Sequence, residues 1–297
     1  MSSVEQFATC IKRIEDVPKP FGEALSNRIC ANEAVVDLIF SPAFRAGRFS
    51  TLASLLCITD SRWLVVLLQG DGSVTVDSAS YETTLLLELT IILLYGQLKI
   101  DFVCDGQVRS TALQFNTVMQ QTYCEALQDI LDEIDHNVES IADSNWVRSE
   151  ILRQWPIKFR NVSIIYAPRS SRLLNGVQWK NICGVFRRQL APAAALLLTD
   201  RHVIVIAEEK PSGWFQFRAR PQYGQIITYL PLDRLASFRI SENSRFDILE
   251  IVGDEGHGKE ALKIMFPHDQ AKAVTRLMNE ASFAPSLTRV KRARSRE

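Results

Sequence analysis

The hydrophobic pattern of the chain contains one short stretch twice. Residues 53–68 read ASLLCITDSRWLVVLL and residues 193–209 read AAALLLTDRHVIVIAEE. In each, an apolar run is followed by Thr-Asp, a polar or basic pair and a second apolar run, which is typical of a β-hairpin. Asp60 and Asp200 stand 140 positions apart in a chain of 297 residues. The repeat therefore indicates a duplicated domain.

In the first half of the chain, apolar runs and turn signals predict about seven strands followed by a helix. Weak helical periodicity predicts an N-terminal helical segment over residues 1–31. From residue 118 to residue 141 the apolar positions recur every three or four residues, which predicts one long amphipathic helix whose acidic end connects the halves. The predicted strands are 34–40, 52–59, 63–68, 83–89, 90–94, 98–102 and 110–115, with Tyr95-Gly96 among the turns.

The second half repeats this order with changes. A hairpin is expected over 194–207 and a helix over 268–281, and the remaining strands are 162–166, 226–230, 235–240, 248–252 and 261–266. Ala167-Pro168 resembles Ser41-Pro42, but these prolines are 126 positions apart rather than 140. We therefore expect about fourteen extra residues between the first two strands of the second copy. This expected insertion contains Trp179, Lys180, Phe186, Arg187 and Arg188.

Runs of strands that end in a helix predict an α+β fold rather than a parallel α/β fold. The predicted organisation has four parts. They are the N-terminal helical segment 1–31, a first domain over 32–142 with a long C-terminal helix, a second domain over 150–283, and a basic disordered tail over 284–297.

The motifs and their order resemble the bacterial pleckstrin-homology-like (PH-like) domains and the related GRAM domains. The shared features are the hairpin motif, here Leu55 to Arg62 and Leu196 to Arg201, and a Phe before the final helix, here Phe115 and Phe266. The resemblance covers about four fifths of the chain, in two copies. It implies two PH-like domains, each a seven-stranded antiparallel partial barrel capped by a C-terminal helix. It also implies a non-enzymatic role, because members of this family bind phosphoinositide headgroups, peptides or other domains.

Composition narrows the class of protein. Lys+Arg and Asp+Glu both number 34, and this balance argues against a general nucleic-acid binder, which usually carries a basic excess. The N-terminus lacks the pattern of a signal peptide, and the apolar run 85–94 is about half the length of a membrane span. The six cysteines show no CxxC spacing, which favours free thiols in a reducing compartment. These features predict a cytoplasmic protein, and the resemblance places it in bacteria.

The candidate ligand-binding residues are basic and aromatic side chains of the second half. Arginine offers phosphate a planar fork of donors, and aromatic residues among arginines could contact a membrane or a peptide. The candidates are Arg169, Arg172, Lys180, Arg187 and Arg188, then Trp214, Arg218 and Arg220. The competing interpretation is a solvated loop and an additional strand. The basic tail 289–296 could likewise bind an anionic membrane or remain only a solvated terminus.

No pattern predicts catalysis, a cofactor or a metal site. Asp60 and Asp200 fit hairpin turns in which the carboxylate accepts hydrogen bonds from backbone N–H groups two residues on. The four histidines are far apart, and none has metal-ligand spacing. The predicted function is a non-enzymatic adaptor that binds a protein or peptide partner. The alternative is peripheral binding at the inner membrane face, through anionic lipid headgroups, by the second domain and the basic tail. Exposed sheet edges would also allow homodimerisation.

Overall fold

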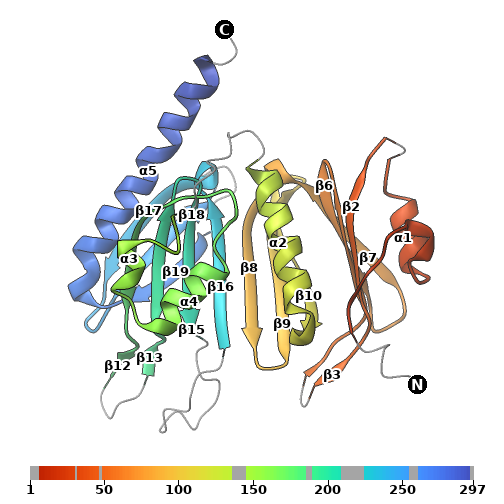
Figure 1. The fold of residues 1–297 in the computed structure, drawn as a ribbon, viewed down its shortest axis with the longest axis horizontal. Helices are drawn as coiled ribbons and strands as arrows, with labels where there is room; N and C mark the ends of the chain where they lie inside the picture. Colours follow the sequence, from red (N-terminus) through yellow and green to blue (C-terminus); the bar gives the residue numbers. More distant parts are fainter. Residues whose placement is uncertain are drawn as a thin grey trace. The chain divides into compact units, whose positions relative to one another are not determined.

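The computed structural model describes residues 7–30, 32–46, 49–135, 145–184, 189–208, 224–253 and 260–294. The side chains of 45–49, 260–261 and 284–294 are not described. The fold is α+β, with mostly antiparallel open sheets and few helices (Figure 1). The chain forms two compact units, Met1–Asn137 and Val138–Glu297.

The described residues of unit 1 form a five-stranded sheet, a set of three antiparallel strands, a short hairpin and two α-helices. The sheet has the order β1-β2-β5-β6-β7, and the three later strands pair β8 with β9 and β9 with β10. The short hairpin β3–β4 lies between β2 and β5 in the sequence. The bounds are β1 Thr9–Cys10, α1 Phe21–Ser26, β2 Val35–Ser41, β3 Arg45–Ala46, β4 Phe49–Ser50, β5 Ser54–Thr59, β6 Arg62–Leu68, β7 Val74–Ser80, β8 Thr84–Ile92, β9 Tyr95–Cys104, β10 Gln107–Asn116 and α2 Gln120–Ile134.

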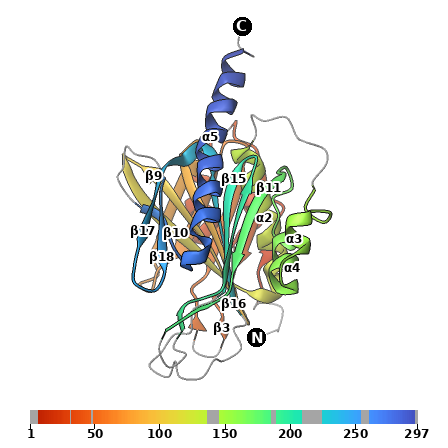
Figure 2. The same ribbon diagram turned by 90° about the vertical axis from the view of Figure 1, so that its left-hand side faces the viewer.

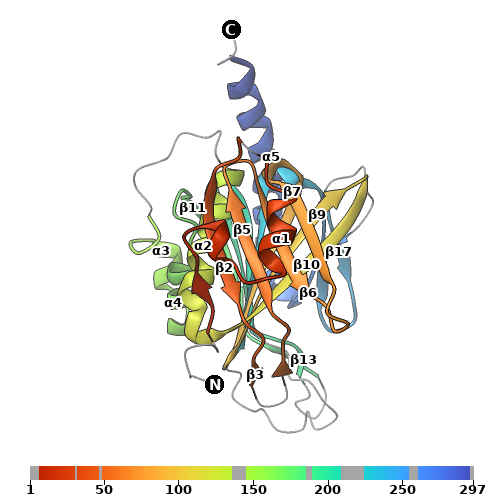
Figure 3. The same cartoon turned by 90° about the vertical axis from the view of Figure 1, so that its right-hand side faces the viewer.

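Strand β5 is buried along its whole length because both faces of its sheet are covered. On one face, Phe21 and Leu25 of α1 pack with Leu55, Cys57 and other apolar residues of β2, β5 and β6. Figure 3 shows α1 lying over these strands. Burial raises the pKa of the Cys57 thiol to about 12, which keeps it protonated at neutral pH.

Unit 2 repeats the order of elements. Four strands pair in the order β16-β15-β14-β11, three more pair in the order β17-β18-β19, and a helix follows. The bounds are α3 Glu150–Arg153, α4 Ile157–Ile165, β11 Leu173–Trp179, β12 Ile182–Cys183, β13 Gln189–Ala191, β14 Ala194–Thr199, β15 His202–Glu208, β16 Gly224–Pro231, β17 Leu235–Glu242, β18 Asp247–Gly253, β19 Glu260–Phe266 and α5 Ala271–Arg294.

The core of unit 2 lies between its two sets of strands and α5. Val274, Leu277 and Met278 of α5 are fully buried against residues of β14, β15, β18 and β19. The opposite face of β11 is covered by the segment before it, where the Trp155 ring lies over Gly176. A Cβ atom at Gly176 would meet that ring at 2.9 Å, so the tryptophan requires glycine there.

The predicted strand 162–166 is wrong. These residues belong to α4, which follows Pro156 at its N-cap. Its buried side chains Phe159, Val162 and Ser163 recur at helical spacing, and this period outweighs the strand preference of a short β-branched run. The first strand of unit 2 is instead β11, which the sequence analysis missed.

The predicted fourteen-residue insertion is also absent. Val35 pairs with Thr59 in unit 1, and Leu173 pairs with Thr199 in unit 2, each beside a register shift at the next residue. The connections to the next long strand cover residues 42–53 and 180–193, so their lengths are similar. The error arose because Pro168 follows a helix, whereas Pro42 follows a strand.

Other boundaries differ from the prediction. Strand β7 was missed because its sequence, VTVDSAS, is largely polar, and the two strands predicted over 83–94 form the single strand β8. In the described part of the N-terminal segment, Thr9–Cys10 is a strand and Phe21–Ser26 is an α-helix. Helix α5 continues to Arg294, where the sequence analysis placed a disordered tail. The expected acidic connector lies largely outside the described residues.

The Thr-Asp turns carry the same hydrogen bonds in both units. Thr59 Oγ1 accepts from the N–H of Arg62 at 3.1 Å, and Thr199 Oγ1 accepts from that of His202 at 2.7 Å. The sequence analysis predicted that each aspartate accepts a bond from a backbone N–H two residues on, and this prediction is wrong. Instead the backbone N–H of Ala34 donates to Asp60, and that of Arg172 donates to Asp200. Each aspartate thus ties the turn to the chain that enters the first long strand.

Candidate functional site

The structure separates the candidate basic residues that it describes. Arg169 and Arg172 are exposed and precede β11, whereas Lys180 follows its last residue, Trp179. Seven strand residues at about 3.3 Å each place the two ends roughly 20 Å apart. These residues therefore cannot form one phosphate site together. The other candidates, Arg187, Arg188, Trp214, Arg218 and Arg220, lie outside the described residues.

Lys180 shares its end of unit 2 with a cation that the sequence analysis did not single out. Arg245 lies in the turn between β17 and β18, and its guanidinium would be 3.2 Å from a Cβ atom at Gly184. Gly184 follows β12 in the connection that begins at Lys180. Both cationic residues are exposed. This end of unit 2 is therefore a basic surface formed by two turns.

A second feature of unit 2 is the edge of its three-stranded sheet beside α5. Strand β17 pairs with β18 and is the outer strand in the sheet order. Its exposed residues include Ser237 and Arg239, while Phe238 and Ile240 pack partly against the core. Figure 2 shows β17 and β18 on one side of α5, and residues of β17 approach the helix. An edge strand presents backbone N–H and C=O groups on which another strand can form.

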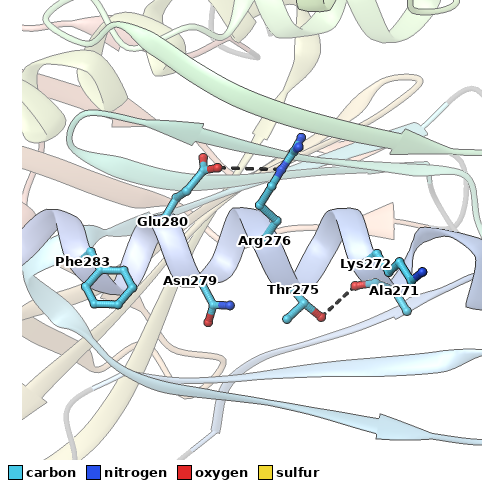
Figure 4. A pocket seen from close by; sticks show the side chains of 7 residues that line it. All are labelled: Ala271, Lys272, Thr275, Arg276, Asn279, Glu280 and Phe283. Carbon is cyan, nitrogen blue, oxygen red and sulfur yellow. Dashed lines mark hydrogen bonds and ion pairs between the residues drawn. The ribbon is translucent and has the colours of Figure 1, made fainter.

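The outer face of α5 forms a shallow hollow of about 510 Å³ (Figure 4). Its lining side chains come from two adjacent ridges of the helix and from Phe283, whose exposed fraction is 71%. An aromatic ring this exposed offers an apolar contact for a partner. The lining residues are Ala271, Lys272, Thr275, Arg276, Asn279, Glu280 and Phe283.

A hydrogen bond and an ion pair hold the side chains on one side of the hollow in place. Asn175 of β11 donates to Glu280 at 2.8 Å, and the Arg276 guanidinium lies 3.8 Å from the same carboxylate. In Figure 4, Arg276 and Glu280 point to one side of α5, and Thr275 and Asn279 to the other. Lys272 and Phe283 remain exposed. We refer to β17 together with the outer face of α5 as the β17–α5 surface.

The β17 strand is held in place by an ion-pair cluster. Glu250 of β18 is paired with Arg239 of β17 and, at 2.5 Å, with Lys263 of β19. Hydrogen bonds from Lys263 and Arg239 lower the pKa of the Glu250 carboxyl. The cluster joins three neighbouring strands and so stabilises β17 against β18, whose pairing is irregular between Leu235 and Ser237.

Groups with perturbed pKa values occupy structural positions rather than a cleft. The pKa of Glu33 is lowered to about 2, first by hydrogen bonds from Arg62 and then by those from Thr59 and the Cys30 backbone. The pKa of Asp37 is raised by burial and by the neighbouring carboxylates Asp129 and Glu125. Burial, and then the charges of Asp37 and Glu125, raise the pKa of the Cys10 thiol, so these carboxylates do not activate it as a nucleophile. Among the residues that the structure describes, no group of His, Cys, Asp or Glu could hold a metal ion.

Sequence patterns gave little warning of the β17–α5 surface. Phe283 lies off the buried stripe of α5, which runs through Val274, Leu277, Met278 and Ala281, and a lone aromatic residue on a helix does not by itself indicate a binding site. The edge position of β17 depends on sheet order, which a single sequence does not reveal. In the described helices, no segment is long and apolar enough to cross a membrane. Comparison with protein-family models and with curated proteins finds no match.

Proposed function

We propose that this chain is a non-enzymatic binding module whose second unit takes an extended peptide segment of a partner protein along β17. The observation that carries the proposal is the outer position of β17 beside α5. A peptide strand can add to such an edge through main-chain hydrogen bonds, and contacts with side chains then give specificity. Phe283 would contact an apolar side chain of the peptide, and Lys272 would favour an acidic residue nearby.

The same proposal includes PH-like folds for both units. Its support is the order of four strands, three strands and one helix, which occurs twice with matching hydrogen bonds at the Thr-Asp turns. In a sandwich of two such sheets, a C-terminal helix buries its apolar stripe and leaves its outer face for contacts. This arrangement suits an adaptor that acts in the cytoplasm.

A random-peptide library selected on the full chain tests the peptide proposal. Enriched peptides should slow hydrogen exchange of the β17 amides, because those groups would gain bonding partners. Phe283→Ala should weaken binding of the enriched peptides by about tenfold, the loss expected for one buried aromatic contact. Ile157→Ala is the matched control, since Ile157 is 75% exposed on α4. The proposal would be contradicted by peptides that protect the amides of other strands. It would also be contradicted by peptides that bind Phe283→Ala as tightly as they bind the parent protein.

A second candidate function is anionic lipid binding by the basic end of unit 2. Its support is the shared position of Lys180 and Arg245. Arg169 and Arg172 do not contribute, because they lie at the far end of β11. Lys180→Ala with Arg245→Ala should abolish binding to vesicles that contain an anionic lipid if this candidate function is correct, and unchanged binding would eliminate it.

A further inference from the structure

Helix α4 carries apolar side chains on its outer face as well as on its inner face. Phe159 and Val162 are buried, whereas Ile157 and Ile165 are 75% and 67% exposed. At 100° per residue, Ile157, Asn161 and Ile165 lie within about 80° of one another, and all three are exposed. We refer to these three residues as the α4 ridge. A helix that is apolar on all sides is typical of a buried element, so the outer face of α4 has the composition of a covered surface.

The α4 ridge points away from the sheet that the helix covers. Lys158 is paired with Glu208 of β15 at 2.6 Å, and the Tyr229 hydroxyl of β16 donates to the carbonyl of Tyr166, which follows α4. The next residue of β16, Leu230, belongs to the core beneath α5. Because successive strand residues point to opposite faces, α4 and α5 cover opposite faces of the sheet. Figure 2 shows the two helices on opposite sides of β11 and β15.

The segment that carries the α4 ridge is basic. Residues 145–174 contain six Lys and Arg and one acidic residue, Glu150, although the whole chain has equal numbers of basic and acidic residues. Glu150 is paired with Arg153, and Lys158 with Glu208. Within the part of the chain that the structure describes, Arg148, Arg160 and Arg172 make no ion pair. Arg160 lies three positions after Ile157, which places it beside the α4 ridge.

The charge of this segment indicates what can cover the α4 ridge. A symmetric dimer through this face would place the same basic patch of each copy against the other. Like charges in such a contact repel, and an arginine that is desolvated without a partner costs free energy. A second copy is therefore disfavoured, and the covering surface should be anionic beside its apolar part.

The shape and composition of the α4 ridge fit a helix better than a bilayer or a nucleic acid. Side chains at i, i+4 and i+8 form the type of ridge that packs into the groove of a neighbouring helix. Asn161 lies in the middle of the ridge. Its amide would lose hydrogen bonds among acyl chains, whereas between helices it can pair with a polar side chain, as a single polar position does in coiled coils. The exposed apolar residues are isoleucines, which cannot stack on bases as aromatic residues do.

We propose that the α4 ridge docks an acidic amphipathic helix of a partner protein. The apolar stripe of that helix packs on Ile157 and Ile165, and its Asp or Glu residues pair with Arg160. Asn161 bonds to a polar side chain in the middle of the stripe. The site lies on the face of unit 2 opposite to α5, so it stands whether or not β17 binds a peptide. For the same reason Ile157→Ala remains a control for the peptide on β17.

Two displayed libraries of helical peptides, each about three heptads long, test this proposal on the full chain. Both have leucine at positions a and d. At e and g, one allows only Asp and Glu as charged residues, and the other only Lys and Arg. The acidic library should be enriched at least about tenfold over the basic one, and Arg160→Glu should reverse this preference.

Enriched acidic peptides should bind the variant Ile157→Gln with Ile165→Gln at least about tenfold more weakly than the parent. Both side chains are exposed, so the thermal stability of this variant should match that of the parent. Val118→Gln is the matched control, because Val118 is an aliphatic residue of unit 1 that is 63% exposed.

Four outcomes would overturn the proposal. The first is equal enrichment of the two libraries. The second is a set of peptides that the isoleucine variant binds as well as the parent does. If Phe283→Ala abolishes their binding, those peptides belong to the β17–α5 surface and the proposal for β17 survives. The third is binding to phosphatidylserine vesicles that the isoleucine variant abolishes while no library peptide binds, because a bilayer would then cover the ridge. The fourth is self-association in sedimentation velocity that the isoleucine variant abolishes, because a second copy would then cover it.

Discussion

At the scale of single residues, Glu33 has the clearest electrostatic role. Arg62 donates two hydrogen bonds to its carboxylate at 2.8 and 2.7 Å, and also bonds to the backbone carbonyl of Arg28. The Glu33 side chain is 4% exposed. Because Thr59 donates to the same carboxylate at 2.7 Å, this ion pair joins the N-terminal segment to the first Thr-Asp turn.

Glu33→Gln should destabilise the protein by roughly 1–3 kcal/mol at neutral pH. The folded-state pKa of Glu33 is about 2, below its ordinary value. Its contribution is therefore present above about pH 4.5 and is lost as the pH falls toward 2. Urea unfolding at several pH values should show the two proteins converging across that window. Glu23→Gln, on an exposed pair with Lys19, should differ little from the parent at any pH.

Gly96 is required by the ring that covers it. Phe115 pairs directly with Gly96 across β9 and β10, and its ring occupies the space of a glycine Cβ atom. Gly96→Ala must therefore displace Phe115 from its stack on Tyr123, at an expected cost of about 1–3 kcal/mol. Gly70→Ala is the matched control because nothing lies within 4 Å of its added Cβ atom. A loss of equal size in both variants would refute this explanation.

At the scale of elements, the Thr-Asp turn is the unit that the two halves share. Thr199 is fully buried, and its hydroxyl accepts from the N–H groups of Arg201 and His202 and donates to the His202 carbonyl. One side chain therefore satisfies three backbone groups of the β14–β15 turn. Thr59 accepts the corresponding bonds from the N–H groups of Ser61 and Arg62 in the β5–β6 turn, and its single hydroxyl proton is shared between the Arg62 carbonyl and the Glu33 carboxylate.

Thr199→Val and Thr59→Val should each lower the free energy of unfolding by about 1–3 kcal/mol, because valine keeps the shape and leaves the turn N–H groups unsatisfied. Thr111→Val provides the contrast. Within the described part of the chain, the buried Thr111 hydroxyl has no hydrogen-bond partner, so its removal should be neutral or stabilising. Urea midpoints of the three variants would check the ranking. Equal effects at all three positions would show that burial alone decides them.

Individual elements also show which strands and helices could be predicted from the sequence pattern alone. The two Thr-Asp hairpins were predictable because each combines two apolar runs with a polar turn. Strand β7 was not, since a sheet edge tolerates the polar residues of VTVDSAS. Helix α4 was misassigned because Val162, Ile164 and Ile165 at its end favour strands individually, while its burial follows the helical period.

At the scale of the whole molecule, the α+β class followed from the order of strand runs and helices. The candidate binding surfaces could not be predicted from the order of strands and helices. Ile157 and Ile165 lie among the apolar residues of α4, so composition made them resemble core residues, whereas Phe283 lies off the buried stripe of α5. Their exposure depends on which face of each helix packs against a sheet. The basic residues of the second half were conspicuous in the sequence, yet β11 holds Arg172 and Lys180 apart.

The matched register of the two first hairpins has a consequence for how such a protein can change. Val35 opposite Thr59 and Leu173 opposite Thr199 define one backbone frame, and the turns are fastened by bonds to backbone atoms that every sequence possesses. Most side chains of these strands therefore take no part in setting the register. We therefore expect that segments cut at equivalent positions could be exchanged between the units with the register of the strands retained. Recombination, in nature or in the laboratory, could thus move a binding surface from one unit to the other in a single step.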